Sequence, residues 1–325
     1  MENTMDTSSS CFFLSPKAWS DTSNNLGYSL LDSGEGMKLE RFGAHTLVRP
    51  ELSAIWHPAL SKDQWDAADG IFHGGGEDEE QDRGKGWQFK KDIEPRWHMQ
   101  WQHVVSDLSR AMSREAEPDI TFFVEPTPFR HVGVFPEQAS QWEWISGKIK
   151  KENRPVKVLN LFGYTGIASL VAAAAGAEVT HVDASKKIIA WARENQKLSR
   201  LEDRPIRWIV DDALKFVKRE VRRGATYDGF IIDPPKFGRG PKGEIWHIYE
   251  HLPMLLDECQ KLFSDNVLFI NLTCYAIRIT PLSLRYALEE RLTDRRGTIE
   301  QGELTLHEQS ANRLLPQAVC ARWSA

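Results

Sequence analysis

Cysteine is scarce in this sequence of 325 residues, and the four cysteines do not cluster. Cys11, Cys259, Cys274 and Cys320 form neither a CxxC metal motif nor a disulfide framework, which excludes a zinc miniprotein and a disulfide-stapled secreted domain. Long apolar runs are also missing, because the longest candidate, 167–175, is far shorter than the roughly 18 residues that cross a bilayer. With no basic leader at its start, the sequence predicts a cytoplasmic protein without a membrane partner.

The net charge is slight, −5 from 41 basic and 46 acidic side chains, but the charges are unevenly distributed. Residues 1–100 carry 10 basic and 17 acidic side chains, whereas residues 186–242 carry 15 basic and 8 acidic ones. The basic stretch either solvates the outer face of a helix or binds a polyanion, and both interpretations stay open. The side chains concerned are Lys215, Lys218, Arg219, Arg222 and Arg223.

Composition divides the chain into three segments. Residues 1–24 are rich in Ser, Thr and Asn and are predicted to form a disordered tail. Residues 25–110 contain short apolar runs split by glycines, which predict a small β-rich domain, and a charged glycine-rich stretch within 71–91, which predicts a long surface loop. Residues 111–325 form the third segment. Eight of the twelve tryptophans precede residue 145, where we expect them to fill a core or an interface. Homo-oligomerisation stays open.

From residue 156 onwards, strand and helix patterns alternate, which is typical of a doubly wound parallel sheet with right-handed crossovers. We therefore predict an α/β fold, namely a Rossmann-like seven-stranded sheet that ends in an antiparallel hairpin. The expected strands are 156–162, 178–182, 206–210, 227–232 and 267–272, followed by the hairpin runs 297–309 and 314–323. The expected helices are 167–175, 186–199, 214–223, 249–263 and 282–292.

Functional residues of such a sheet lie in the loops that follow the strands. In the first loop, 162–166, Thr165 stands where a dinucleotide fingerprint has its second glycine, so NAD or FAD is disfavoured relative to a nucleoside cofactor without phosphate. Asp183 follows the second strand, where a carboxylate accepts from ribose hydroxyls, and Asp211 and Asp212 follow the third, where an acceptor meets an adenine amino group. Together these features predict a pocket for S-adenosylmethionine. Each aspartate also suits a helix cap, which is the alternative.

The fourth loop, IIDPPKF, carries the most specific motif. Pro234 and Pro235 hold Asp233 extended and stiff just beyond the fourth strand. We expect this loop to bind the substrate: Asp233 meets the edge of a planar base, Phe237 stacks on a flipped base, and Lys236 meets phosphate. A simple proline turn is the alternative.

Cys274 stands at the end of the fifth strand. A thiolate at this position would add to C6 of a pyrimidine and turn C5 into a carbon nucleophile that accepts a methyl group. The alternative is a small buried apolar residue, which is also the role expected of Cys259 and Cys320. No metal is predicted, because Ile248 stands where an HExxH motif beginning at His247 would need glutamate.

Taken together, VLNLFGYTG, VDAS, DDALKF and DPPKF resemble the class I S-adenosylmethionine-dependent methyltransferases, and more narrowly the family of ribosomal RNA large-subunit cytosine-C5 methyltransferases. The resemblance covers about residues 120–325 and includes the upstream segment FRHVGVFPEQ. Residues 25–110 do not resemble the PUA domain with which those relatives begin. Thr273 and Tyr275 flank Cys274 where the family has serines.

The resemblance implies specific roles for residues of this sequence. Asp233 and Lys236 would belong to the target-base loop, and Cys274 would take the nucleophile position. Pro234, Pro235 and Phe237 would line the substrate. Cofactor contacts are implied for Phe135, Gln138, Phe162, Gly163, Tyr164, Thr165, Gly166, Asp183, Ser185, Asp212 and Asp233.

We therefore predict an S-adenosylmethionine-dependent methyltransferase that acts on a base in RNA, with cytosine C5 as first choice and Cys274 as covalent nucleophile. One alternative is methylation of an amino nitrogen of a nucleobase or small molecule, in which the DPPKF loop orients the amine and Cys274 only packs. A second alternative is a non-catalytic nucleic-acid-binding protein that keeps the fold. A dehydrogenase is a third, disfavoured by Thr165.

Overall fold

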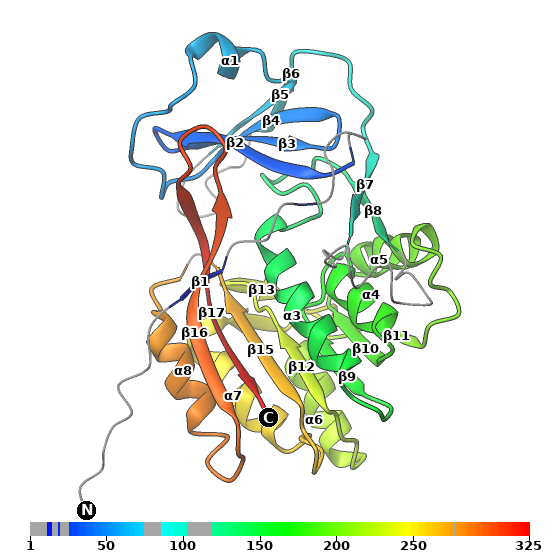
Figure 1. The fold of residues 1–325 in the computed structure, drawn as a ribbon. Coiled ribbons are helices and arrows are strands. Elements are labelled where there is room, and N and C mark those ends of the chain that lie inside the picture. Colours follow the sequence, from blue (N-terminus) through cyan, green and yellow to red (C-terminus); the bar gives the residue numbers. More distant parts are fainter. Residues whose placement is uncertain (1–11, 15–18, 20–25, 75–85, 103–118, 276) are drawn as a thin grey trace, which may run out of the picture.

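The structure, a computed structural model of the whole chain, describes residues 12–14, 19, 26–74, 86–102, 119–275 and 277–325. Its main body is an eight-stranded sheet, which confirms the predicted α/β fold with its C-terminal antiparallel hairpin (Figure 1). The strands lie in the order β1 (Phe12–Leu14), β16 (Thr298–His307), β17 (Leu314–Ser324), β15 (Phe269–Cys274), β12 (Gly229–Ile232), β9 (Lys157–Leu161), β10 (Glu178–Asp183) and β11 (Ile206–Val210). The strands from β15 to β11 are parallel, whereas β17 is antiparallel to both of its neighbours.

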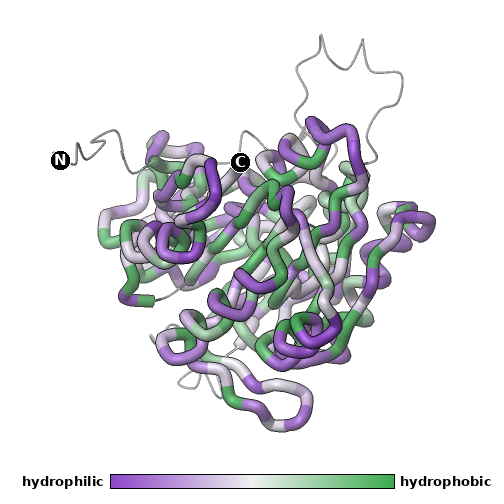
Figure 2. Tube along the Cα trace, turned by 90° about the horizontal axis from the view of Figure 1, so that it is seen from below, coloured by the Kyte–Doolittle hydropathy of each residue, from purple (hydrophilic) through white to green (hydrophobic). Residues whose placement is uncertain are grey.

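Helices cover both faces of this sheet. They are α3 (Ala139–Lys150), which the sequence analysis did not predict, and α4 (Ile167–Ala174), α5 (Lys186–Leu198), α6 (Ala213–Arg222), α7 (Ile248–Gln260) and α8 (Pro281–Glu289), which begin within one residue of the expected starts. Alternate strand residues enter opposite cores: Phe230 and Ile232 pack with α6, α7 and α8, whereas Ile231 packs with α3 and α4. Apolar segments concentrate inside and hydrophilic ones in the peripheral loops (Figure 2). Across the described residues, no helix has the length and apolar character of a membrane span.

The N-terminal part of the chain forms a second, five-stranded sheet, as its β-rich pattern predicted (Figure 1). Its strands are β2 (Tyr28–Gly34), β3 (Met37–Phe42), β4 (His45–Pro50), β5 (Gly70–His73) and β6 (Gly86–Phe89), and the short helix α1 (Lys62–Asp66) precedes β5. Most of the loop predicted within 71–91 lies outside the described residues. The predicted boundary at residue 110 falls between β7 (Trp97–Trp101) and β8 (Ile120–Val124), which pair with each other, and it stays a prediction.

Most of the predicted disordered tail, residues 1–24, also lies outside the described residues, but two parts of it correct the prediction. Phe12–Leu14 forms β1, which pairs in parallel with β16. Trp19 is 5% exposed and belongs to an apolar core. The physical reason is that the edge of β16 presents backbone donors and acceptors that need partners, and an apolar tripeptide supplies them.

A tryptophan-rich core joins the N-terminal sheet to the main body. Trp142 of α3 lies at its centre, with ring centroids 5.8 Å from Trp19 and 5.6 Å from Trp101, both edge-on. Residues of β2, β3, β4, β7, β8, α4, β16 and β17 belong to the same cluster. Six of the eight early tryptophans therefore lie in or against the core between the two sheets, whereas Trp65 and Trp144 pack in separate clusters.

A buried ion pair supports this contact from within the N-terminal sheet. Arg49 donates from Nε and from Nη2 to the two carboxylate oxygens of Glu40, at 2.7 and 2.8 Å. Burial opposes the charge of Glu40, but the adjacent Arg49 and Lys38 outweigh it and lower the pKa of this carboxyl. Lys38 in turn donates to Gln317 of β17 at 2.6 Å. The bond between Lys38 and Gln317 thus connects the buried charged residues of the N-terminal sheet to the C-terminal hairpin.

Replacing Glu40 by glutamine is expected to lower the free energy of unfolding by about 3 kcal/mol, because it leaves the buried Arg49 without a counter-charge. The matched control is Glu258→Gln, which removes a pair with Lys261 whose cation is 54% exposed and should cost less than about 1 kcal/mol. Urea unfolding of both variants measures the difference. Equal losses in the two variants would contradict the prediction.

Candidate functional site

The carboxyl ends of the parallel strands meet at one rim of the main sheet, where the sequence analysis placed the site. The amide of Gly163 donates to the carbonyl of Val182 at 3.1 Å, and the amide of Asp211 donates to the carbonyl of Asp183 at 3.1 Å. The loops after β9, β10 and β11 are thus hydrogen-bonded in a row. Since β12 lies in register beside β9, Asp233 reaches the same rim.

The first loop has positive φ angles, which residues other than glycine rarely adopt. Phe162, Tyr164 and Gly166 have φ angles of 58°, 50° and 87°, and for the two non-glycine residues such angles cost of order 1 kcal/mol or more each. Gly163 is required for another reason, since a Cβ at this position would lie 2.3 Å from Cε1 of His181. The loop therefore approaches β10 so closely that only glycine fits beside the His181 ring.

Thr165, predicted as a cofactor contact, holds this loop in place. Its hydroxyl donates to the carbonyl of Gly133 at 2.7 Å, and Asn195 donates from Nδ2 to its carbonyl at 2.9 Å. The residue is buried. These bonds connect the loop to the segment before α3 and to α5, so that the unfavourable φ angles are fixed from both sides.

Asp183 stands at the tip of β10 and is oriented by two backbone amides. The amide of Tyr164 donates to Oδ2 at 3.1 Å and that of Ser185 to Oδ1 at 2.8 Å. Burial raises the pKa of the Asp183 carboxyl. Each carboxylate oxygen keeps a second lone pair, and two fixed acceptors at a strand tip match the two hydroxyls of a ribose. The residues present therefore fit the nucleoside part of S-adenosylmethionine.

The third loop supplies the two aspartates that follow β11. Oδ1 of Asp212 accepts from the amide of Lys215 at 2.9 Å and caps α6, which is the alternative weighed from the sequence. Asp211 pairs with Arg219 at 2.6 Å. The cap is therefore present at Asp212, and the contact of this residue with adenine stays a prediction. Ser185 likewise caps α5, through the amide of Ile188.

Asp233 is the most distinctive group at the rim. Gln138 donates from Nε2 to Oδ2 of Asp233 at 3.0 Å, whereas Oδ1 is shielded from solvent and has no partner among the residues described. Burial, with the nearby Glu137 carboxyl, raises the pKa of Asp233 to about 8. In the ionised form, an acceptor left unpaired in a dry site costs about 1–3 kcal/mol, and a donor from a ligand would remove that cost.

Glu137 and Tyr275 complete the surroundings of Asp233, and the sequence analysis assigned neither of them a role. Gln138 also donates to the hydroxyl of Tyr275 at 3.0 Å, and this hydroxyl bonds to the buried carboxyl of Glu137. The ring of Phe135 lies between those of Tyr164 and Tyr275, with centroids 5.6 and 5.2 Å apart. Only one feature of the sequence could have pointed to these two residues: Glu137 directly precedes Gln138, and Tyr275 directly follows Cys274.

Cys274 ends β15 in apolar surroundings and is 1% exposed. Burial raises the pKa of the Cys274 thiol, and the nearby Asp233 carboxylate raises it further. A reactive cysteine has the opposite environment, with a cation or a base that stabilises the thiolate. The geometry brings Cys274 close to Asp233, but its chemistry favours the neutral thiol.

Beyond Asp233 the chain turns outward. Pro234 is buried, and the carbonyl of Pro235 accepts from the indole of Trp246 at 2.8 Å. Lys236 is exposed and Phe237 is 45% exposed at the start of a short hairpin. The hairpin consists of β13 (Phe237–Arg239) and β14 (Ile245–His247).

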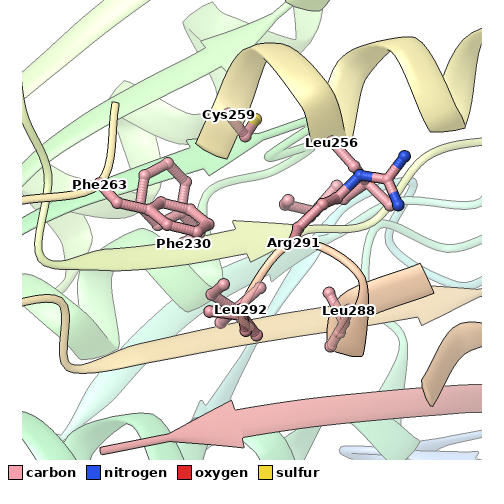
Figure 3. A pocket seen from close by; sticks show the side chains of 9 residues that line it. Phe230, Leu256, Cys259, Phe263, Leu288, Arg291 and Leu292 are labelled. Carbon is pink, nitrogen blue, oxygen red and sulfur yellow. The ribbon is translucent and has the colours of Figure 1, made fainter. Parts of the chain in front are cut away.

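An internal cavity of about 10 Å³ lies away from this rim, between α7, α8 and the sheet (Figure 3). Apolar side chains line it, including Phe230, Phe263 and Leu292, and the guanidinium of Arg291 points away from the rings. This volume barely holds one water molecule, so the cavity is a packing gap and not a ligand site. In the part of the chain that the structure describes, no three His, Cys, Asp or Glu side chains gather as metal ligands.

The fold and the rim define a doubly wound α/β protein of the methyltransferase type. A crystal structure of the S-adenosylmethionine-dependent methyltransferase from Agrobacterium tumefaciens is 43% identical in sequence, with a TM-score of 0.84, over 96% of this chain and 93% of that chain. The chain therefore belongs to the S-adenosylmethionine-dependent methyltransferases. It is an enzyme of this class, and S-adenosylmethionine is its cofactor.

More distant relatives share the fold or match part of the sequence. A protein of Streptococcus mutans, provisionally described as an S-adenosylmethionine-dependent methyltransferase, has a TM-score of 0.65 at 16% identity over 92% of this chain and 76% of its own, which shows the common fold. The ribosomal RNA large subunit methyltransferase K/L of Hahella chejuensis is 31% identical over 171 residues, 52% of this chain and 23% of that protein. Its counterpart in Alteromonas mediterranea is 30% identical over 213 residues, 62% of this chain and 29% of that protein. The chain spans less than a third of these curated relatives, and no family model matches it.

Gly163→Ala is expected to weaken S-adenosylhomocysteine binding at least tenfold, because the new Cβ would press on the ring of His181 and displace the cofactor loop. Gly147→Ala in α3 is the control, since a Cβ there meets no atom within 4 Å. Isothermal titration calorimetry of both variants tests the prediction. An unchanged dissociation constant for Gly163→Ala would refute the assignment of this loop.

Proposed function

We propose that this methyltransferase transfers a methyl group to an exocyclic amino nitrogen of a base in ribosomal RNA. The observation that carries the proposal is Oδ1 of Asp233, a shielded acceptor without a partner among the described residues, next to two prolines at the rim. An amino group brings the N–H donor that this oxygen lacks. Ribosomal RNA is supported by the K/L relatives, whose names give that substrate and which match 52% and 62% of this chain.

Residues of this chain would prepare the amine for attack. The lone pair of an exocyclic amine is delocalised into the ring of the base, and a hydrogen bond from its N–H to Asp233 returns electron density to the nitrogen. Gln138 occupies Oδ2 and leaves Oδ1 for the substrate. Pro234 and Pro235 fix the direction of the carboxylate. When bound, S-adenosylmethionine supplies an electrophilic methyl group.

Asp233 would also receive the proton that the nitrogen loses. A carboxylate whose pKa is about 8 binds a proton more strongly than an ordinary aspartate at neutral pH, as a general base of this reaction should. The hydroxyl of Tyr275 accepts from the Gln138 amide and bonds to the carboxyl of Glu137. These bonds would keep the Gln138 amide directed at Asp233. We propose Tyr275 and Glu137 as positioning residues.

Cytosine C5, the first choice from the sequence, requires a thiolate that adds to C6 of the base. Burial and the charge of Asp233 disfavour that thiolate at Cys274. The environment of Cys274 therefore supports the other role weighed from the sequence, in which this residue only packs.

Cys274→Ala is expected to keep kcat within about threefold of wild type, whereas Asp233→Ala should lower kcat at least a hundredfold, because it removes both the acceptor and the base. Cys259→Ala, another buried cysteine but remote from the rim, controls for packing loss. Transfer of a tritiated methyl group to ribosomal RNA from a strain lacking the gene measures the rates. Mass spectrometry of the methylated nucleoside locates the methyl group, and a loss of turnover in Cys274→Ala with a C5-methyl product would overturn the proposal.

The pH profile provides an independent test of Asp233. Because its pKa is raised to about 8, the carboxyl is protonated below this pH and ionised above it. We expect kcat/KM to rise about tenfold per pH unit up to roughly pH 8 and then to level off, and we expect Asp233→Asn to lose this dependence. A wild-type profile that is flat between about pH 6 and 9 would exclude the proposed base.

A further inference from the structure

The β13–β14 hairpin follows directly from the Asp233 loop and has two different faces. Its strands pair Phe237 with His247, Gly238 with Trp246, and Arg239 with Ile245. Side chains of successive residues point to opposite faces of a strand, so 238 and 246 share one face and the other four residues share the second. Trp246 is 3% exposed, whereas Phe237 and Ile245 are 45% and 53% exposed. The second face is thus an outer face that the other described residues leave largely exposed.

The inner face anchors the hairpin to the methyl-transfer site. The indole of Trp246 donates to the carbonyl of Pro235 at 2.8 Å. Its ring lies 4.8 Å from that of Phe162 in the cofactor loop and 5.6 Å from that of His251. The hairpin is therefore held in a fixed position between the base-binding loop and solvent, so that a group bound on its outer face is a neighbour of the target base.

The outer face has the composition of a nucleic-acid surface. Phe237 and His247 present two rings at a centroid distance of 5.0 Å, and Arg239 contributes a cation. The segment 236–247 contains one carboxylate, Glu244, which is turned to Lys215 and to the amide of Lys242. An exposed face with two rings and a cation, beside the aliphatic Ile245, suits the stacking of unpaired bases and the attraction of phosphate.

The other basic surface, on α6, is less suited to this role. Three of its five cations are bound by carboxylates: Lys215 by Glu244, Arg219 by Asp211 and Arg223 by Glu220. This pairing favours the solvated helix face over polyanion binding, the two interpretations that the sequence left open. The hairpin combines its cation with two exposed rings, and this combination suits unpaired nucleotides better than cations alone.

We infer that the outer face of the β13–β14 hairpin binds the unpaired nucleotides that flank the target base. This inference rests on the proposed function, because it takes RNA as the substrate. The partner is a single-stranded segment, since rings that stack on bases need bases already released from a duplex. A hairpin so close to Asp233 would select target bases by the unpaired context in which they lie.

The test is binding of a fluorescein-labelled, unstructured 20-nucleotide RNA and of its duplex, followed by anisotropy. Phe237→Ala is expected to weaken single-strand binding at least fivefold. Arg239→Ala should reduce the slope of log K against log salt by about 0.7, the value for one phosphate contact on a single strand. Tyr286→Ala on α8 and Arg222→Ala on α6 are the matched controls, and both should bind within twofold of wild type. Calorimetry with S-adenosylhomocysteine and thermal melting verify that each variant is folded and keeps its cofactor site.

The outcomes separate the two proposals. If wild type binds the single strand and the hairpin variants bind it equally well, the hairpin assignment is wrong while the proposed function stands. Equal affinity for the duplex, or loss in Arg222→Ala instead, also overturns the hairpin assignment. If wild type binds S-adenosylhomocysteine but neither RNA, the RNA substrate itself is refuted and the hairpin assignment is refuted with it.

Discussion

The hydrogen bond from the amide of Tyr164 to the carboxylate of Asp183 is the constraint on which the site depends. It joins a turn with two non-glycine residues in the left-handed region to the tip of the neighbouring strand, and such a turn persists only where its surroundings hold it. Thr165 and the amide of Gly163 hold the same turn from its other sides. The same bond therefore orients the carboxylate for ribose and stabilises the loop that approaches the cofactor.

A second constraint comes from the parallel order of the sheet. Because β12 lies between β9 and β15, the loops that contain Phe162, Asp233 and Tyr275 emerge side by side although they are far apart in the sequence. Gln138, from the segment before α3, then bonds to both Asp233 and Tyr275. In a dry environment each of these bonds is stronger than in water, and each group left unpaired is more costly. The unpaired oxygen of Asp233 is thus a feature that the fold maintains at a price in stability.

Much of this arrangement could be predicted from the sequence, because its physical causes are local. Buried parallel strands read as continuous apolar runs, Pro281 occupies the first turn of α8, and Gly176 after α4 has a φ of 104° that favours glycine. The ends of the strands fix the positions of the loops that follow, so Asp183, Asp212 and Asp233 could be assigned to one rim, while their contacts with ligands stay predictions. The environment of Cys274 could not be predicted in this way, since its burial depends on helices packed from elsewhere in the chain.

Other features escaped prediction for the same reason. β13 and β14 have three residues each, too few for a periodic pattern, and β1 is recognisable only once β16 offers it an edge. The bond between Gln138 and Tyr275 spans 137 residues of sequence. No local rule detects such a pair, even though Gln138 itself and Cys274, the neighbour of Tyr275, were both singled out.

The pairing of β1 with β16 has a consequence for biosynthesis. Thr305 of β16 bonds to the carbonyl of Leu14, a partner 291 residues earlier in the chain. Since residues leave the ribosome in order, Phe12–Leu14 emerges long before the strand that pairs with it, and its backbone edge stays unpaired until β16 has been synthesised. The sheet can close at this edge only after about 290 further residues have been added to the chain.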